Sequence, residues 1–258
     1  MCGRYVLIDG KIVFAVSAQL QTWRNEGKEF DILPRYDARP TDLMPIIAQR
    51  NSTARVEMMR WGLVPHWSKD GKTEFTTFNA KSETLHTSKL FAPYFKAARC
   101  LVPAEGFFEW KKYETETIVR GKPKVVEQKQ KMFIRMKDGA PFMMAGLFSV
   151  WKNDAGEEFP TYTIITTEPN ELMAGIHTRM PVILPPSQYD VWIDRSMNDL
   201  DFLRTLLVPY PADRMTAFPV KNKSEESPSA VERIEFEVPP APALMKAAAP
   251  ITTPKKKH

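Results

Sequence analysis

The chain has 258 residues, 43% hydrophobic and 26% charged, a balance that supports one large globular domain or two small ones. No run approaches the roughly 18 apolar residues of a membrane span, and charges interrupt the N-terminal stretch where a signal peptide needs an apolar core. Two cysteines exclude a disulfide framework and a zinc-ligand cluster. We therefore expect a soluble, cytoplasmic protein with reduced thiols, no metal, no cofactor and no membrane contact.

The formal net charge of +5 suggests nucleic-acid binding, but most of it lies at one end of the chain. Residues 239–258 hold four of the 36 basic residues and none of the 31 acidic ones, which leaves 32 basic against 31 acidic residues elsewhere. Only a local cluster of charge would therefore argue for DNA. Because the segment is also rich in Pro and Ala, we expect a domain over residues 1–224 and a disordered tail over 225–258.

Short β-like runs separated by turn residues dominate the chain, at intervals typical of antiparallel sheets. Helical stretches are short, and Pro93 should split the helix in which it lies. Charged residues 112–132 surround a Gly-Lys-Pro turn and suggest a hairpin or an excursion. In chain order we predict helix 16–26, strand 55–61, helix 81–97, strands 99–102, 107–111, 132–136, 142–151 and 161–166, and helices 169–175, 186–194 and 198–206. The pattern predicts an α+β fold with an antiparallel, barrel-like β core and flanking short helices.

Cys2 directly follows the initiator methionine. Once Met1 is removed, Cys2 carries an α-amine with a reference pKa of about 7.7–8.0 and a thiol with one of about 8.5. Such a 1,2-aminothiol condenses with an aldehyde to an imine and then closes through sulfur to a thiazolidine, which no internal cysteine can do. A terminal nucleophile can also use its own amine as a base. The alternative is that Cys2 has no chemical role and is an incidental small residue at a frayed chain end.

Two polar stretches contain further candidates. In FNAKSETL, Asn79 can both donate and accept hydrogen bonds, and Lys81 can neutralise a phosphate. Asn79 also fits the N-cap of a helix, with Glu83 in the first turn. In AGIHTRMPVIL, His177 is suited to proton donation near neutral pH and Arg179 to a forked contact with phosphate. A single histidine is more often structural or exposed.

Aromatic residues surround a carboxylate in GFFEWKK. Alternation places Glu109 on one face of this strand and Phe108 and Trp110 on the other. If Glu109 is buried, a raised pKa would suit it to proton transfer. The sequence is equally compatible with a solvent-facing glutamate on an edge strand. In RWGLVPHW, Trp67 lies at a turn, where it can stack on an unpaired base as Trp110 can. We assign Trp61 to the core.

Together these fragments resemble one family. MCGRY, PRYDARPT, RWGLVPHW, FNAKSET, CLVPAEGFFEW and GIHTRMPVIL follow one another over about residues 1–220. They are similar to the SRAP (SOS response-associated peptidase) proteins, which shield abasic sites in DNA. The resemblance implies a barrel-like antiparallel core with flanking helices. It also implies a mature N-terminal cysteine that reacts with the ring-opened aldehyde of an abasic site in single-stranded DNA, giving a thiazolidine crosslink.

The resemblance also implies roles for individual residues. Cys2 would be the nucleophile, and Asn79 would position its amine or the opened sugar. Glu109 would orient and deprotonate the amine, and His177 would protonate the sugar ring oxygen and assist reversal. The implied DNA contacts are Arg4, Lys81, Arg179, Trp67 and Trp110.

Such contacts hold the backbone without reading sequence, so binding should weaken with salt. The resemblance further implies DNA cutting by β-elimination and self-removal of Met1. We expect a monomer acting on single-stranded DNA that contains abasic sites. In a bacterium it would be associated with the nucleoid, and replication-associated proteins would be its possible further partners.

Three departures from the family pattern leave parts of this picture open. Lys81 stands where Arg is common, which replaces a forked contact with a point charge. Asp37 and Arg39 stand where Asn and a small residue are frequent, and this leaves the local electrostatics open. Thr178 replaces an acidic or amide residue beside His177, which leaves the orientation of that ring open.

Two alternative functions remain. An N-terminal-nucleophile cysteine peptidase acting on protein would share Cys2 but would need neither Trp67 nor Lys81. A non-covalent single-stranded DNA-binding module would tolerate Cys2→Ala without loss.

Overall fold

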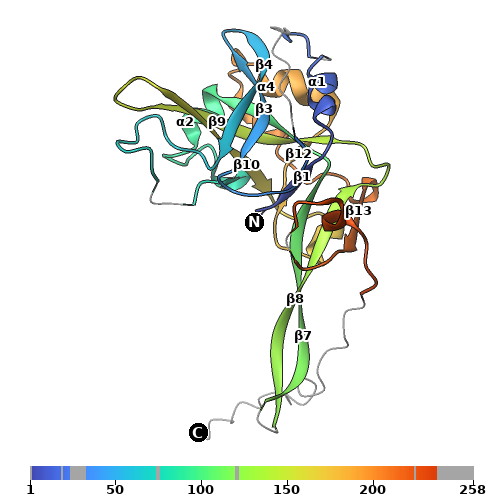
Figure 1. Cartoon of the computed structure of the whole chain (residues 1–258). Coiled ribbons are helices and arrows are strands. Elements are labelled where there is room, and N and C mark those ends of the chain that lie inside the picture. Colours follow the sequence, from blue (N-terminus) through green and yellow to red (C-terminus); the bar gives the residue numbers. More distant parts are fainter. Residues whose placement is uncertain are drawn as a thin grey trace, which may run out of the picture.

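A computed structural model describes residues 2–18, 20–23, 33–73, 76–119, 122–223 and 225–236 of the chain (Figure 1). Two β-sheets make up most of this part. The larger has the strand order β11-β10-β4-β3-β6-β9-β12, and β5 pairs with β10. Its strands are β3 (Leu43–Arg50), β4 (Thr53–Trp61), β5 (Asn79–Lys81), β6 (Arg99–Ala104), β9 (Phe142–Lys152), β10 (Glu158–Thr167), β11 (Met180–Pro181) and β12 (Ile183–Leu184).

The larger sheet closes on itself. β9 pairs with β10 as well as with β6, so β10, β4, β3, β6 and β9 form a closed five-stranded barrel. The β4–β10 pairing is parallel, with Thr161 opposite Arg60, while the other four pairings are antiparallel. The predicted barrel-like core is therefore confirmed, with one parallel closure that the sequence pattern did not indicate.

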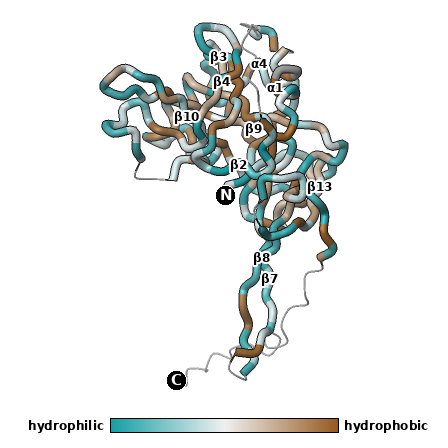
Figure 2. The backbone as a smooth tube through the Cα atoms, viewed as in Figure 1, coloured by the Kyte–Doolittle hydropathy of each residue, from teal (hydrophilic) through white to brown (hydrophobic). Residues whose placement is uncertain are grey.

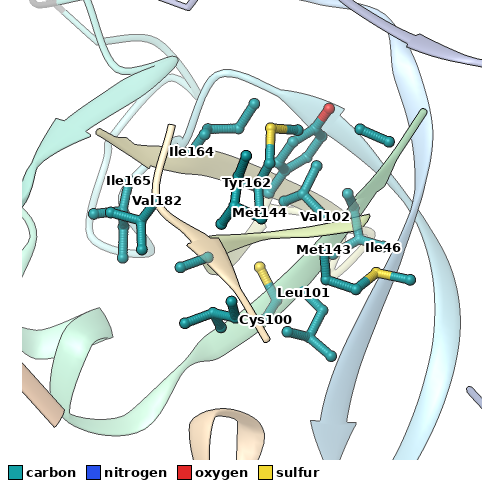
Figure 3. Close-up of a cluster of buried hydrophobic side chains, with 14 of the residues drawn as sticks. Ile46, Cys100, Leu101, Val102, Met143, Met144, Tyr162, Ile164, Ile165 and Val182 are labelled. Carbon is teal, nitrogen blue, oxygen red and sulfur yellow. The ribbon is translucent and has the colours of Figure 1, made fainter. Parts of the chain in front are cut away.

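Apolar side chains from neighbouring strands gather in one cluster around the barrel strands (Figure 3). Ile46 of β3, Val102 of β6, Met144 of β9, and Tyr162 and Ile164 of β10 are all fully buried. Burying one such side chain is worth about 1.5–3 kcal/mol relative to leaving it exposed. The hydrophobic segments of the chain accordingly concentrate in the barrel (Figure 2).

The second sheet has the order β13-β8-β7-β1-β2. Its strands are β1 (Tyr5–Leu7), β2 (Arg35–Ala38), β7 (Gly106–Val119), β8 (Lys122–Met136) and β13 (Met215–Pro219). Beyond the sheet, β7 and β8 continue as a two-stranded ribbon that projects from the body and is largely hydrophilic (Figures 1 and 2). The hairpin expected for residues 112–132 is confirmed.

The alternation predicted for β7 is also confirmed, and it orients the candidate site. Phe107 packs in the main core, whereas Phe108 packs with Phe133 and Phe218 in a separate cluster that Trp110 joins. Glu109 therefore points to the same side of the sheet as Phe107.

Gly106→Ala is expected to destabilise the fold. A Cβ at Gly106 would lie 2.3 Å from Cε2 of Phe133 and 2.9 Å from the carbonyl oxygen of Ile134. Overpacking of this kind costs about 1–3 kcal/mol. Urea unfolding should show a lower midpoint for this variant than for Gly175→Ala, because a Cβ at Gly175 meets nothing within 4 Å. Equal midpoints would contradict the close packing described here.

The helices are short and flank the sheets: α1 (Gly10–Ser17), α2 (Ala92–Ala97), α3 (Glu171–Ala174), α4 (Tyr189–Ile193) and α5 (Leu200–Thr205), with 3₁₀ turns η1 (Ser82–Thr84), η2 (Pro186–Gln188), η3 (Ala212–Arg214) and η4 (Pro228–Val231). The six predicted strands and the last three predicted helices are confirmed. Among the helices of the described residues, none has the length and hydropathy needed to cross a membrane.

One predicted helix has the wrong bounds, and another is split in two, as Pro93 predicted. The helix expected at 16–26 begins at Gly10 and ends at Ser17, and Trp23 forms a β-bridge with Ala54; residues 24–26 lie outside the described residues. The stretch expected to be helical at 81–97 forms two separate pieces, η1 and α2, and Pro93 lies in the first turn of α2, so the predicted split is confirmed. The pattern also missed seven strands: β1, β2, β3, β5, β11, β12 and β13.

The beginning of the predicted tail packs against the body. Ala230 is buried in η4, the Ile234 N–H donates to the Pro219 carbonyl at 3.0 Å, and the ring of Phe236 contacts Tyr113. Disorder from residue 225 is therefore wrong for residues 225–236. Residues 237–258 lie outside the described residues.

Candidate active site

Cys2 lies just ahead of β1, where that strand meets the base of the β7–β8 hairpin (Figure 1). The Phe108 N–H donates to the Arg4 carbonyl at 3.0 Å and extends the ladder in which Tyr5 faces Phe107. The Cys2 side chain is fully buried. Burial, and next the negative charge of Glu109, raise the pKa of its thiol above the ordinary value. The described part of this segment is thus packed rather than frayed, and its thiol is protonated at neutral pH.

Glu109 faces this buried thiol from β7. The residue is 2% exposed, and β7 is an interior strand of its sheet, so the solvent-facing edge position is wrong. Burial raises the pKa of the Glu109 carboxyl to about 8. A carboxyl with such a pKa can hold a proton or release it near neutral pH, as general acid–base catalysis requires.

His177 follows α3, whose start is capped by Asn170: its side-chain oxygen accepts from the Met173 N–H at 2.9 Å. The His177 N–H in turn donates to the Met173 carbonyl at 2.8 Å, which fixes the backbone behind the ring. Nε2 of His177 lies 3.9 Å from Oε2 of Glu109. The sequence candidates Cys2, Glu109 and His177 are therefore brought together from three distant segments.

The contacts of His177 Nδ1 with the backbone of Arg179 bear on which ring nitrogen carries the proton. The Arg179 N–H donates to Nδ1 at 3.1 Å, which favours the neutral tautomer with its proton on Nε2, on the side of Glu109. Burial lowers the pKa of His177, which favours this neutral form. In the protonated ring, Nδ1 can donate to the Arg179 carbonyl, 3.2 Å away.

Asn79 occupies the first position of β5, opposite Ile164 of β10. The N-cap interpretation is wrong, because η1 begins after Lys81 without any side-chain cap. Nδ2 of Asn79 donates to the Phe78 carbonyl at 2.7 Å, and its Oδ1 is buried without a hydrogen-bond partner among the described residues. A buried acceptor of this kind is costly to leave unpaired and is available to a ligand donor.

Arg179 is held by Glu83, a partner that the sequence analysis placed only in a helix turn. Both terminal nitrogens of Arg179 donate to the two carboxylate oxygens of Glu83, and one also donates to the Thr166 carbonyl at 2.6 Å. Only 16% of the Arg179 side chain is exposed, whereas Lys81 at the end of β5 is exposed. Lys81 is thus the more accessible cation of the two.

The two tryptophan candidates differ in setting. Trp67 is 62% exposed and lines a cavity of about 580 Å³ together with Lys69, Lys72 and Leu90. Trp110 is partly buried, and the guanidinium of Arg4 lies 5.8 Å from its ring centre. In the described part of the chain, no three His, Cys, Asp or Glu side chains form a group that could hold a metal ion.

Comparisons with known proteins show the family to which the chain belongs. The family model for SOS response associated peptidase (SRAP) matches residues 1–226. The chain belongs to the SRAP family. It is 36% identical over 222 residues to the abasic site processing protein YoqW of Bacillus subtilis, covering 86% of this chain and 93% of that one. It is 31% identical over 245 residues to the abasic site processing protein HMCES of Gallus gallus, covering 86% of this chain and 71% of that one.

Solved structures show the same SRAP-type fold. A crystal structure of a protein from Bacteroides thetaiotaomicron superposes with a TM-score of 0.73 at 28% identity, covering 91% of this chain and all of that one. A protein from Bordetella bronchiseptica superposes with a TM-score of 0.64 at 26% identity, covering 85% of this chain and all of that one. The family resemblance seen in the sequence is therefore confirmed for this SRAP chain.

Proposed function

We propose that this SRAP protein captures abasic sites in single-stranded DNA covalently, through a thiazolidine formed by Cys2 after Met1 has been removed. The observation that carries the proposal is the buried Cys2 thiol beside Glu109, with His177 3.9 Å from that carboxylate. The names of the relatives, abasic site processing proteins, support the same substrate. The protein would act as a cytoplasmic monomer on DNA.

The first step is formation of the imine. The pKa of the Glu109 carboxyl, about 8, is close to the reference pKa of an α-ammonium group. The carboxylate can therefore take a proton from the α-ammonium group of Cys2. The freed amine of Cys2 attacks the C1′ aldehyde of the ring-opened sugar. The resulting hemiaminal loses one water, whose leaving oxygen takes a proton from Glu109; the nitrogen then returns its own proton to the Glu109 carboxylate, and the C=N bond of a neutral imine results.

The second step closes the ring through sulfur. The Cys2 sulfur adds to C1′ of the imine, and the thiol proton passes to the nitrogen. The sum of both steps is aldehyde plus aminothiol giving thiazolidine plus one water, with no oxidant or reductant. Because burial keeps the thiol protonated, sulfur does not compete with the amine for the aldehyde in the first step.

The surrounding side chains would prepare the sugar. Nε2–H of His177 would donate to the ring oxygen of the closed sugar as the ring opens, and Oδ1 of Asn79 would accept from a sugar hydroxyl or from the amine. Arg4, Lys81, Arg179, Trp67 and Trp110 would contact the DNA. Cutting of the strand by β-elimination through the imine and self-removal of Met1 are further activities that this site would support.

A denaturing gel tests the proposal. Purified protein, shown by intact mass to lack Met1, is incubated with a single-stranded oligonucleotide carrying one abasic site. We expect a slow band with the native protein and with Cys100→Ala, since Cys100 is a fully buried barrel residue. No band should form with Cys2→Ala or with undamaged DNA.

Absence of the band from protein that lacks Met1 would overturn covalent capture. The same protein would then be assayed for cleavage of peptides, because the family's name includes peptidase and an N-terminal cysteine peptidase shares the nucleophile. If instead the native protein and Cys2→Ala bind abasic DNA equally and neither gives a band, the protein is a non-covalent DNA-binding module.

A further inference from the structure

Asp37 of β2 joins two arginines on one oxygen. Its side chain is fully buried, and its Oδ2 accepts from Arg4 at 2.5 Å and from Arg39 at 2.9 Å. The two donating nitrogens are therefore at most 5.4 Å apart, the sum of these distances. The side chains of Arg4 and Arg39 remain 24% and 48% exposed. A buried carboxylate thus holds two guanidinium groups side by side at the surface.

Lys131 of β8 balances this carboxylate from the interior. Its side chain is fully buried, with Nζ 4.0 Å from Oδ1 of Asp37 and 3.8 Å from the centre of the Phe108 ring. Nζ has no hydrogen-bond partner in the described part of the chain. Glu225 also acts on Lys131, and it lies 3.9 Å from Lys223.

The charge of the cluster therefore remains positive at the surface. Arg4, Arg39 and Lys131 oppose the single carboxylate of Asp37, so the four groups carry a net charge of +2. Since Lys131 cannot reach solvent, the two arginines present this charge. Adjacent guanidiniums suit a phosphate group, which accepts two or more charge-assisted hydrogen bonds at about 2.7–2.9 Å.

The position of the cluster connects it to the proposed site. Arg4 is two residues from Cys2, and its guanidinium lies over the ring of Trp110, the neighbour of Glu109. Arg39 shares the Asp37 oxygen with Arg4 and so lies beside it. Its guanidinium has no hydrogen-bond partner among the described residues other than Asp37.

We infer that Arg39, aligned with Arg4 by Asp37, forms a binding site for a phosphodiester of single-stranded DNA flanking the nucleotide beside Trp110. Asp37 and Lys131 are positioning residues in this site. Asp37, whose effect on the local electrostatics the sequence left open, thus organises two cations. The inference rests on the proposed function, since it extends the same DNA path.

The test compares Arg39→Ala with Arg204→Ala. Arg204 lies on α5, is 46% exposed and is paired with Asp201, so it matches Arg39 in exposure and pairing. Binding to an undamaged fluorescent oligonucleotide is measured by anisotropy at several salt concentrations. We expect Arg39→Ala to weaken binding about 3- to 10-fold at low salt and to reduce the salt slope by about 0.7, the value for one phosphate on a single strand. Arg204→Ala should change neither.

A methylphosphonate walk locates the contact. Replacing one phosphodiester at a time with a neutral methylphosphonate should weaken binding of the native protein at one linkage, and Arg39→Ala should be insensitive there. Equal affinities and slopes for Arg39→Ala and Arg204→Ala would overturn the inference. It would also be overturned if inorganic phosphate raised the Tm of the native protein but not of Arg39→Ala while DNA binding stayed equal, since the ligand would then be a free anion.

The crosslinking assay separates this inference from the proposed function. Arg39→Ala should still crosslink to completion when abasic DNA is saturating, because Cys2 and Glu109 are unchanged. If the native protein forms no crosslink but Arg39→Ala still loses affinity and salt slope, covalent capture fails and the phosphodiester site stands.

Discussion

Glu109→Gln is expected to slow formation of the abasic-site crosslink by about 100-fold or more. Glutamine keeps the shape of the side chain but cannot take a proton from the Cys2 amine, and positioned general bases contribute about 10²–10⁴-fold. Because the pKa of Glu109 is about 8, the native rate should rise with pH and level off above that value. Single-turnover crosslinking between pH 5.5 and 9 measures both effects.

The pH profile is the decisive readout for Glu109. The variant should lose the rise that the native protein shows up to pH 8. Glu127→Gln is the matched control, since Glu127 is an exposed glutamate of the partner strand β8 that pairs with Lys112. A Glu109→Gln protein that keeps both the native rate and the native profile would remove Glu109 from the mechanism.

The same substitution should increase stability at alkaline pH. The folded pKa of Glu109 lies above its unfolded value, so between about pH 4.5 and 8 the folded state holds a proton that the unfolded state has released. The native protein therefore loses stability as pH rises through this window, by at most about 5 kcal/mol. Glu109→Gln should lack this loss and unfold at a higher Tm than the native protein at pH 8.5. At pH 4 the two Tm values should be nearly equal.

The largest loss of stability is expected for Asp37→Asn. This change leaves Lys131 buried without its counter-charge, and removing one partner of a buried ion pair costs about 3–5 kcal/mol. Arg4 and Arg39 also lose their shared carboxylate. Urea unfolding should show a strongly reduced midpoint.

Combining Asp37→Asn with Lys131→Met should restore part of that loss. Lys131→Met alone leaves Asp37 paired with both arginines and should be mild, and in the double variant no buried charge remains unbalanced. The double variant should therefore be more stable than the sum of the two single changes predicts. Strictly additive unfolding energies would contradict the buried Asp37–Lys131 pairing.

Local signals account for the parts of the fold that were predicted. Alternation in GFFEW separated Phe107 and Glu109 from Phe108 and Trp110, and the structure keeps that separation. Pro93 correctly marked a helix boundary. The pattern failed for β3, where Pro45 interrupts the run of β-like residues. It also failed for Asn79–Lys81, which have a helix-like composition but form a strand because they pair in parallel with β10.

Among the site residues, the sequence identified the reactive groups but not their partners. Glu83 was seen only as a helix-turn acid, although it holds Arg179 from 96 positions away. Asp37 was seen only as a departure that left the local electrostatics open, although Lys131 and two arginines surround it. These partners are set by strand pairing between distant segments, for which a single sequence carries no local signal.

By itself, the sequence determined the strand-rich α+β class, the SRAP family and the candidates Cys2, Asn79, Glu109 and His177, because motifs and alternation are properties of neighbouring residues. Only the tertiary structure decided that the Cys2 thiol is buried beside Glu109, that His177 faces the same carboxylate, and that Asp37 gathers two arginines. Burial and proximity depend on how β1, β2, β7 and β8 pair, and that pairing sets the desolvation that raises the pKa of Glu109.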